Sequence, residues 1–149
     1  MNYSQIRKMD ISDGPGCRVA IYFSGRDLYC KGCHNYTIWD FNSGKPFTDE
    51  TITEILELSK LDYISGLSIL GGEPLHKNNI EGTLKLIKKF KEVYPNKTVW
   101  VWTGYLLKDV IDKIKYSPID VLIDGKFDID LFDPKLRYRG SSNQRVIDF

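Results

Sequence analysis

Short apolar runs that stop at glycine-containing pairs recur along the chain and predict buried strands. The runs cover residues 18–23, 67–70, 99–102 and 121–123. Each is rich in aliphatic or aromatic residues, and each is followed at once by a pair that contains glycine. Runs of this length bounded by glycine are typical of strands that are covered on both faces.

Between these runs the apolar positions recur at helical spacing. Thr51 and Glu54 offer a capping box for a first helix that ends near Lys60. Two further periodic runs, over residues 80–94 and 107–114, are each closed off by a proline. The alternation of strands with helices predicts right-handed βαβ units and a parallel sheet.

Four parallel strands, with a fifth over residues 144–147, are too few to close a barrel. We therefore predict an α/β fold in the form of an open, partial parallel βα barrel. The carboxyl ends of parallel strands meet at one edge, where such folds build their ligand sites. The residues that follow the strands are expected to face one shared pocket there.

Composition and charge predict the number of domains, the kinds of partner and the cellular location. The chain has 149 residues, of which 42% are hydrophobic, and this suffices for one domain over residues 1–149 with its own core. A net charge of +1 argues against a nucleic-acid partner. Because no apolar stretch is long enough to span a bilayer and the start lacks a secretory hydrophobic region, we expect a cytoplasmic protein with no membrane partner.

The densest chemistry lies after the first strand, where Cys30 and Cys33 form a Cys-x-x-Cys pair. In a cytosolic protein this spacing indicates metal binding or redox chemistry before a structural disulfide. For the pair alone, metal binding and a pair of reduced thiols in a loop stay equally open. A thioredoxin-like dithiol is less favoured, because the residues after Cys33 show no amphipathic helix.

Glycine and polar residues at the later strand ends are weaker candidates. Gly71 and Gly72 let a ligand approach the backbone closely, and Glu73 follows them. Thr103 and Asp124, the latter with Lys126 nearby, could anchor a cation or an amino group. Taken singly, each of these stretches is better explained as turn chemistry.

Together these features resemble a known family along nearly the whole chain. The matching stretches are Asp13-Gly-Pro-Gly16, Ser24-Gly25, Cys30-Lys-Gly-Cys33-His-Asn35, Trp39, Gly71-Gly-Glu-Pro74, Trp100-Val-Trp-Thr-Gly-Tyr105, Asp120-Val-Leu-Ile-Asp-Gly-Lys126 and Arg139-Gly-Ser-Ser-Asn-Gln144. In this order the chain resembles the activating proteins of anaerobic ribonucleoside-triphosphate reductases, which are small members of the radical S-adenosylmethionine family.

The resemblance implies a partial barrel of the radical S-adenosylmethionine type and a radical mechanism. In this family a 4Fe-4S cluster held by three cysteines binds S-adenosylmethionine at its open iron and cleaves it with one electron. The resulting 5′-deoxyadenosyl radical removes a hydrogen from a glycine of the reductase and leaves a glycyl radical. The implied partners are the large glycyl-radical subunit of the reductase and an electron donor such as a flavodoxin.

The resemblance also assigns roles by position. Cys30 and Cys33 would be the metal ligands, and the turn after the second predicted strand would contact the methionine end of the cosubstrate through Gly72. The cosubstrate-binding candidates as a whole are Gly32, Cys33, His34, Gly71, Gly72, Glu73, Thr103 and Asp124.

One position departs from the family motif, because its first cysteine falls on Arg26. Arginine offers N–H donors and no lone pair, so Arg26 cannot ligate iron. Cys17 opens the first strand, roughly 20 Å from the loop that leaves its other end, so we expect a buried small side chain there instead of a ligand. The chain as written is therefore expected to bind substoichiometric iron, and the alternative is a non-catalytic module that binds the reductase without an active cluster.

A chain of this kind must also accept a glycine loop from a much larger protein. Aromatic and arginine side chains are the usual anchors of such surfaces. We expect them in residues 36–39 and in Arg137 and Arg139, although Trp39 is slightly better explained by packing under the cysteine loop.

Overall fold

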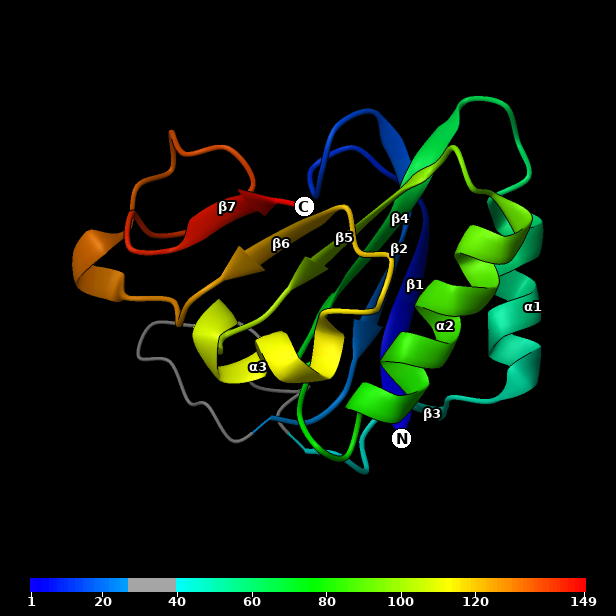
Figure 1. Ribbon diagram of the computed structural model, residues 1–149, viewed down its shortest axis with the longest axis horizontal. Helices are drawn as coiled ribbons and strands as arrows, with labels where there is room; N and C mark the ends of the chain where they lie inside the picture. The colour runs from blue at the N-terminus through cyan, green and yellow to red at the C-terminus, as the bar shows by residue number, and fades with distance from the viewer. Residues whose placement is uncertain (27–39) are drawn as a thin grey trace.

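The computed structural model describes residues 1–26 and 40–149 and has one mixed sheet with helices packed on it (Figure 1). The strands are β1 (Asn2–Asp10), β2 (Cys17–Phe23), β3 (Lys45–Pro46), β4 (Ile64–Gly71), β5 (Thr98–Trp102), β6 (Val121–Asp124) and β7 (Arg145–Asp148). The helices are α1 (Asp49–Leu58), α2 (Ile80–Val93), α3 (Leu107–Ile114) and the short 3₁₀ turn η2 (Ile129–Leu131).

The strand order across the sheet is β3-β1-β2-β4-β5-β6-β7. The neighbours β2, β4, β5 and β6 are parallel, whereas β1 and β3 on one side and β7 on the other are antiparallel. Since β3 and β7 stand at opposite ends of this order, the sheet of the described residues is open. The prediction of an open α/β fold with four parallel strands is confirmed at this level.

The two faces of the sheet are covered differently. One face packs against the three α-helices in a core that includes Ile55 of α1, Phe90 of α2 and Val110 of α3 (Figure 1). The other face, called the helix-free face because no α-helix of residues 1–26 and 40–149 covers it, has a smaller apolar cluster around Trp100, onto which Tyr138 packs. Because side chains alternate along a strand, neighbouring residues of β2, β4 and β5 point to opposite faces.

Several elements differ from the prediction: β1, β3 and η2 were not predicted, and α1 begins earlier than expected. Strand β1 was not predicted, because its sequence is mostly polar and only Tyr3 and Ile6 pack onto the main core. Helix α1 begins at Asp49, so the capping box predicted at Thr51 and Glu54 is wrong. Thr51 instead accepts a hydrogen bond of 3.1 Å from the main-chain N–H of Thr48, which shows that the helix starts one turn earlier.

The remaining predicted elements are confirmed with small shifts in their bounds. Helices α2 and α3 coincide with the predicted periodic runs, and β7 is the predicted last strand, although it is antiparallel. Among the described residues, none of the helices has the length and apolar character needed to cross a bilayer.

Candidate functional site at the carboxyl edge of the sheet

A cavity of about 180 Å³ lies at the carboxyl ends of the parallel strands. It is lined by Tyr22, Arg26, Leu70, Gly71, Gly72, Glu73, Trp102, Thr103, Gly104, Gly125, Phe127 and Gln144. All four parallel strands, or the residues that follow them, contribute to this wall. The structure thus brings Gly71, Gly72, Glu73 and Thr103 together, as the sequence predicted for one shared pocket.

The Gly71-Gly72 turn is held against the end of β2 at close range. Gly71 has a φ of +115°, which favours glycine. A side-chain carbon on Gly72 would lie 2.4 Å from the carbonyl oxygen of Gly25, so no larger residue fits there without movement. The N–H groups of Gly72 and Glu73 donate to the carbonyls of Phe23 and Gly25 at 2.8 and 2.9 Å. Gly71 and Gly72 therefore present only their backbone to the cavity.

Glu73 braces this turn against the end of β5. Glu73 is 1% exposed. One of its carboxylate oxygens accepts two hydrogen bonds, from the hydroxyl of Thr103 at 2.6 Å and from the N–H of Leu75 at 3.0 Å. The other oxygen accepts a hydrogen bond of 2.7 Å from the N–H of Gly104. These three hydrogen bonds compensate for much of the cost of burying the carboxylate. Glu73 and Thr103 thus hold each other and fix the distance between two walls of the cavity.

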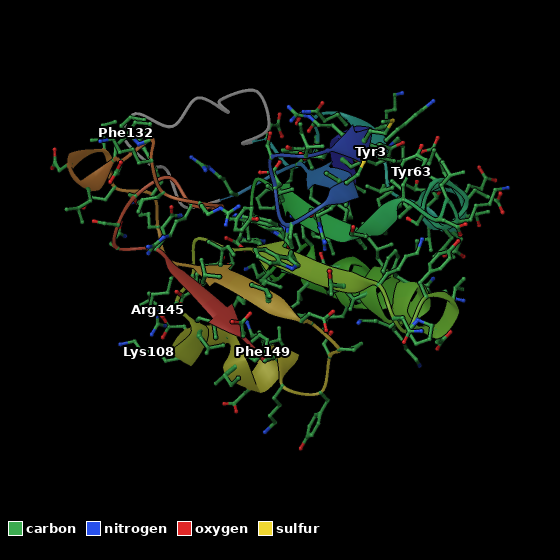
Figure 2. All side chains as sticks on the ribbon, turned by 90° about the horizontal axis from the view of Figure 1, so that it is seen from above. Tyr3, Tyr63, Lys108, Phe132, Arg145 and Phe149 are labelled. Atoms are coloured by element: carbon green, nitrogen blue, oxygen red, sulfur yellow. The ribbon has the colours of Figure 1, made fainter. Side chains whose placement is uncertain are left out.

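Asp124 is fully buried and lies behind the wall, outside the residues that line the cavity. Its carboxylate accepts hydrogen bonds from the N–H of Leu107, at 2.8 Å, and from the guanidinium of Arg145. Burial alone would raise the pKa of Asp124, but these hydrogen bonds and the charge of Arg145 lower it below its usual range. Figure 2 shows Arg145 of β7 close to Lys108 at the start of α3. This agrees with the hydrogen bonds by which Arg145 and Leu107 both reach Asp124. Asp124 therefore connects β6, β7 and the start of α3.

Other residues singled out in the sequence are only partly placed. Arg26 is 8% exposed and lines the cavity. Cys17, predicted to be a buried small side chain, lies at the amino end of β2 opposite Ile64, where it is half-buried and packs against the main core. The predicted ligands Cys30 and Cys33 lie outside the described residues, as do Gly32, His34 and residues 36–39.

Two neighbouring carboxyl groups, one of which contacts a residue of the cavity wall, were not predicted as functional. Asp10 is 3% exposed, and one of its oxygens accepts from the N–H of Ser12 at 2.8 Å, while its side chain also hydrogen-bonds Asp13. The carboxyl group of Asp13 accepts a hydrogen bond of 2.9 Å from the hydroxyl of Tyr22, which lines the cavity. Burial, together with the hydrogen bond and negative charge of Asp10, raises the pKa of Asp13 to about 7. The only sequence signal was the Asp13-Gly-Pro-Gly turn.

Arg18 was read from the sequence as part of an apolar strand, yet its guanidinium is fully buried on the helix-free face of the sheet. It donates to the hydroxyl of Ser68 at 2.8 Å and to the hydroxyl and carbonyl of Thr98 at 2.9 and 2.8 Å. Burial lowers the pKa of Arg18 to about 10, which leaves it charged at neutral pH. This cation lies on the same face as Trp100, at 5.8 Å from the ring.

The donor set fits an iron–sulfur cluster in two of the three family positions. Thiolates spaced as Cys30 and Cys33 are suitable ligands for iron, whereas Arg26 supplies no lone pair at the third. The backbone of Gly71 and Gly72 offers the close, side-chain-free approach that a small polar ligand needs. The described edge can therefore hold a ligand against the glycine turn.

Comparisons with known proteins show the family to which this chain is similar. A family model described as a 4Fe-4S single cluster domain matches residues 12–147. Proteins named anaerobic ribonucleoside-triphosphate reductase-activating protein are similar along nearly the full length. The relative from Escherichia coli (strain K12) is 43% identical over 98% of this chain and 97% of its own length. Those from Pasteurella multocida (strain Pm70) and enterobacteria phage T4 are 41% and 40% identical, over 100% and 98% of this chain and 98% and 93% of their own lengths.

Proposed function

Because this chain belongs to the family of anaerobic ribonucleoside-triphosphate reductase-activating proteins, we propose that it is a radical-generating oxidoreductase that forms the glycyl radical of such a reductase. The observation that carries the proposal is the match to these relatives along 98% or more of the chain. A binding module without chemistry is not favoured, because the matched family is that of a 4Fe-4S domain.

The residues of the cavity are proposed to position the cofactor and its cosubstrate. Cys30 and Cys33 would hold a 4Fe-4S cluster, which when bound and reduced supplies the electron that cleaves S-adenosylmethionine. The backbone from Gly32 to His34 would lie along the cosubstrate, and Gly72 would receive its methionine amine. These assignments rest on the family motif and on the close approach that the glycine turn allows.

We propose that three residues keep the walls of the cavity in place: Glu73, Thr103 and Asp124. The carboxylate of Glu73 holds the glycine turn against Thr103 and Gly104. Asp124 precedes Gly125 in the wall and keeps β6 next to α3 through Leu107. The chain's own contribution is thus a pre-formed, partly closed edge that orients the cosubstrate and limits the access of water.

Several finer features follow from the same family. We propose that the open sheet is the partial barrel of the radical S-adenosylmethionine type and that residues 1–149 act as one domain. The proposed partners are the glycyl-radical subunit of the reductase and a flavodoxin-like electron donor in the cytoplasm, with no nucleic acid and no membrane.

The test is an anaerobic activation assay on the chain as written and on the Arg26→Cys variant. Each protein is reconstituted with iron and sulfide and mixed with dithionite, S-adenosylmethionine and a purified anaerobic reductase. We expect substoichiometric iron and a weak glycyl-radical signal from the parent chain, because only two thiolates are present. Arg26→Cys is expected to bind about four irons per chain and to give a strong electron paramagnetic resonance signal.

Lys108→Cys serves as the matched control, since it adds a thiol at an exposed position on α3. It should leave iron content at the parent level. The absence of methionine, 5′-deoxyadenosine and glycyl radical with both the parent and Arg26→Cys would refute the proposed function. Four irons on the unchanged parent would instead show that Arg26 does not occupy a ligand position.

A further inference from the structure

Asn79 is a buried amide whose position in the sequence suggests a different role from the one it has in the structure. It is the residue before the first turn of α2, where asparagine commonly caps a helix. Its side chain makes no capping hydrogen bond there. Because it is 1% exposed, its amide must find partners elsewhere in the protein.

Those partners are two loops that border the cavity. The side-chain nitrogen Nδ2 of Asn79 donates to the carbonyl of Ser24 at 3.1 Å and to the carbonyl of Glu73 at 3.0 Å. Ser24 follows β2 and leads into the cysteine segment, and Glu73 belongs to the glycine turn after β4. One amide group thus uses both of its hydrogens to tie the two loops together.

This bond completes a short ladder between the loops. The carbonyls of Phe23 and Gly25 accept the N–H groups of Gly72 and Glu73. The carbonyl of Ser24, between them, accepts Asn79. Three consecutive carbonyls at the start of the cysteine segment are therefore satisfied, and Asn79 is the one side chain that takes part.

The position of Asn79 is fixed by main-chain hydrogen bonds and by the packing of helix α2. The main-chain N–H of Asn79 donates to the carbonyl of His76 at 2.8 Å, and its own carbonyl accepts from Thr83 at 3.0 Å. Further along the helix, Leu86 and Phe90 are fully buried in the main core. The place of the amide is therefore set by packing on the far side of the sheet from the helix-free face.

We propose that Asn79 is a positioning residue that sets the spacing between residues 24–26, at the end of β2, and the Gly71-Gly72 turn. The inference rests on the proposed function, in which S-adenosylmethionine binds in the cavity that Arg26 and Gly72 line. Loss of the amide leaves α2 in place but lets the two parts of the site move relative to each other. The cosubstrate then binds more weakly, because the walls of its cavity are no longer held at the right distance from each other.

The variants are Asn79→Ser, which keeps a good helix-capping residue but is too short to reach both carbonyls, and Asn79→Ala. Asn78→Ala is the matched control, because Asn78 is the same residue type, next in sequence and exposed. Each change is made in the parent chain and in the Arg26→Cys background. Binding of S-adenosylmethionine is measured anaerobically by calorimetry, with iron per chain and urea unfolding measured on the same samples.

We expect both Asn79 variants to raise the Kd for S-adenosylmethionine roughly tenfold, with the number of sites per chain and the iron content unchanged. Asn78→Ala should stay within about twofold of its parent. A merely structural role would lower the number of binding-competent sites and leave the Kd of the remainder unchanged, and that result would overturn the inference, as would an unchanged Kd at full occupancy. If neither background binds S-adenosylmethionine, the proposed function itself fails and this inference fails with it.

Discussion

Asp13 belongs to a turn sequence of the kind usually found at protein surfaces, yet its carboxyl group lies against that of Asp10. One oxygen of the buried Asp10 side chain has no hydrogen-bond donor among the described groups unless Asp13 carries a proton. The hydroxyl of Tyr22 and the charge of Arg7 act on Asp13 from β2 and β1 and partly offset its raised pKa. The pair therefore binds one proton more tightly than either carboxyl group would alone.

This pair predicts a specific pH dependence of stability. Because the pKa of Asp13 is raised to about 7 in the folded protein, the folded state holds a proton that the unfolded state has lost. The free energy of unfolding should therefore fall as the pH rises from about 4 to about 7 and stay level above that range. Asp13→Asn keeps a neutral, hydrogen-bonding side chain and should gain on the order of 2 kcal/mol over the parent at pH 8.

Urea unfolding at pH 5 and pH 8 measures this difference. Asp62→Asn, which alters an exposed aspartate, is the control and should follow the parent at both pH values. Equal pH dependence of the parent and Asp13→Asn would show that Asp10 and Asp13 do not share a proton.

Side-chain roles were harder to predict than side-chain positions. The sequence placed Glu73 and Asp124 at the strand ends, but their partners Thr103 and Arg145 are 30 and 21 residues away. Asn79 was missed because asparagine before a helix is expected to cap it, and Arg18 because a strand of apolar residues gives no sign that one arginine is buried among them. Such roles depend on long-range hydrogen bonds, which local sequence does not reveal.

The strands were predicted well where glycine ends a buried run. The four parallel strands lie where their apolar runs predicted, because each is covered on both faces and so leaves an uninterrupted pattern. Strand β1 pairs with β2 near the edge of the sheet and exposes much of its length, so its pattern is weak. The two-residue β3 is too short to give any pattern.

Besides its pairing with β6, β7 is joined to the buried Asp124 by an ion pair of Arg145, and this predicts an unequal effect of two exposed cations. The side chain of Arg145 is 58% exposed, but its partner Asp124 is fully buried. Arg145→Ala would leave a buried carboxylate without its counter-ion, and we expect a clearly larger loss in the free energy of unfolding than from the removal of an exposed cation that has no buried partner. Urea unfolding at neutral pH measures it.

Lys108→Ala, on the adjacent turn of α3, is the control and should cost less than about 0.5 kcal/mol. Equal small losses from both substitutions would show that the carboxylate of Asp124 is sufficiently stabilised by the N–H of Leu107.

For the molecule as a whole, the surface that receives the reductase remains a prediction, and the structure distinguishes its two arginine candidates. Arg139 donates to the carbonyl of Gln144 and so supports its own loop. Arg137 is exposed and lies 5.5 Å from the ring of Tyr138, next to the helix-free face. Arg137 is therefore the better candidate for contact with a partner.

Arg137→Ala is expected to weaken retention of the reductase several-fold in co-purification, equivalent to about 1–2 kcal/mol of binding free energy. Lys135→Ala removes another exposed cation of the same loop and should have little effect. Retention of the reductase at the parent level by Arg137→Ala would exclude this arginine from the docking surface.

The placement of two tryptophans on the helix-free face has a practical consequence. Trp102 lines the cavity, and its ring centre lies 5.9 Å from that of Trp100. A ligand that enters the cavity displaces water from beside one indole and changes the polarity around a coupled pair of fluorophores. Intrinsic emission should therefore report cosubstrate binding in a sealed, oxygen-free cuvette, without any label attached to the protein.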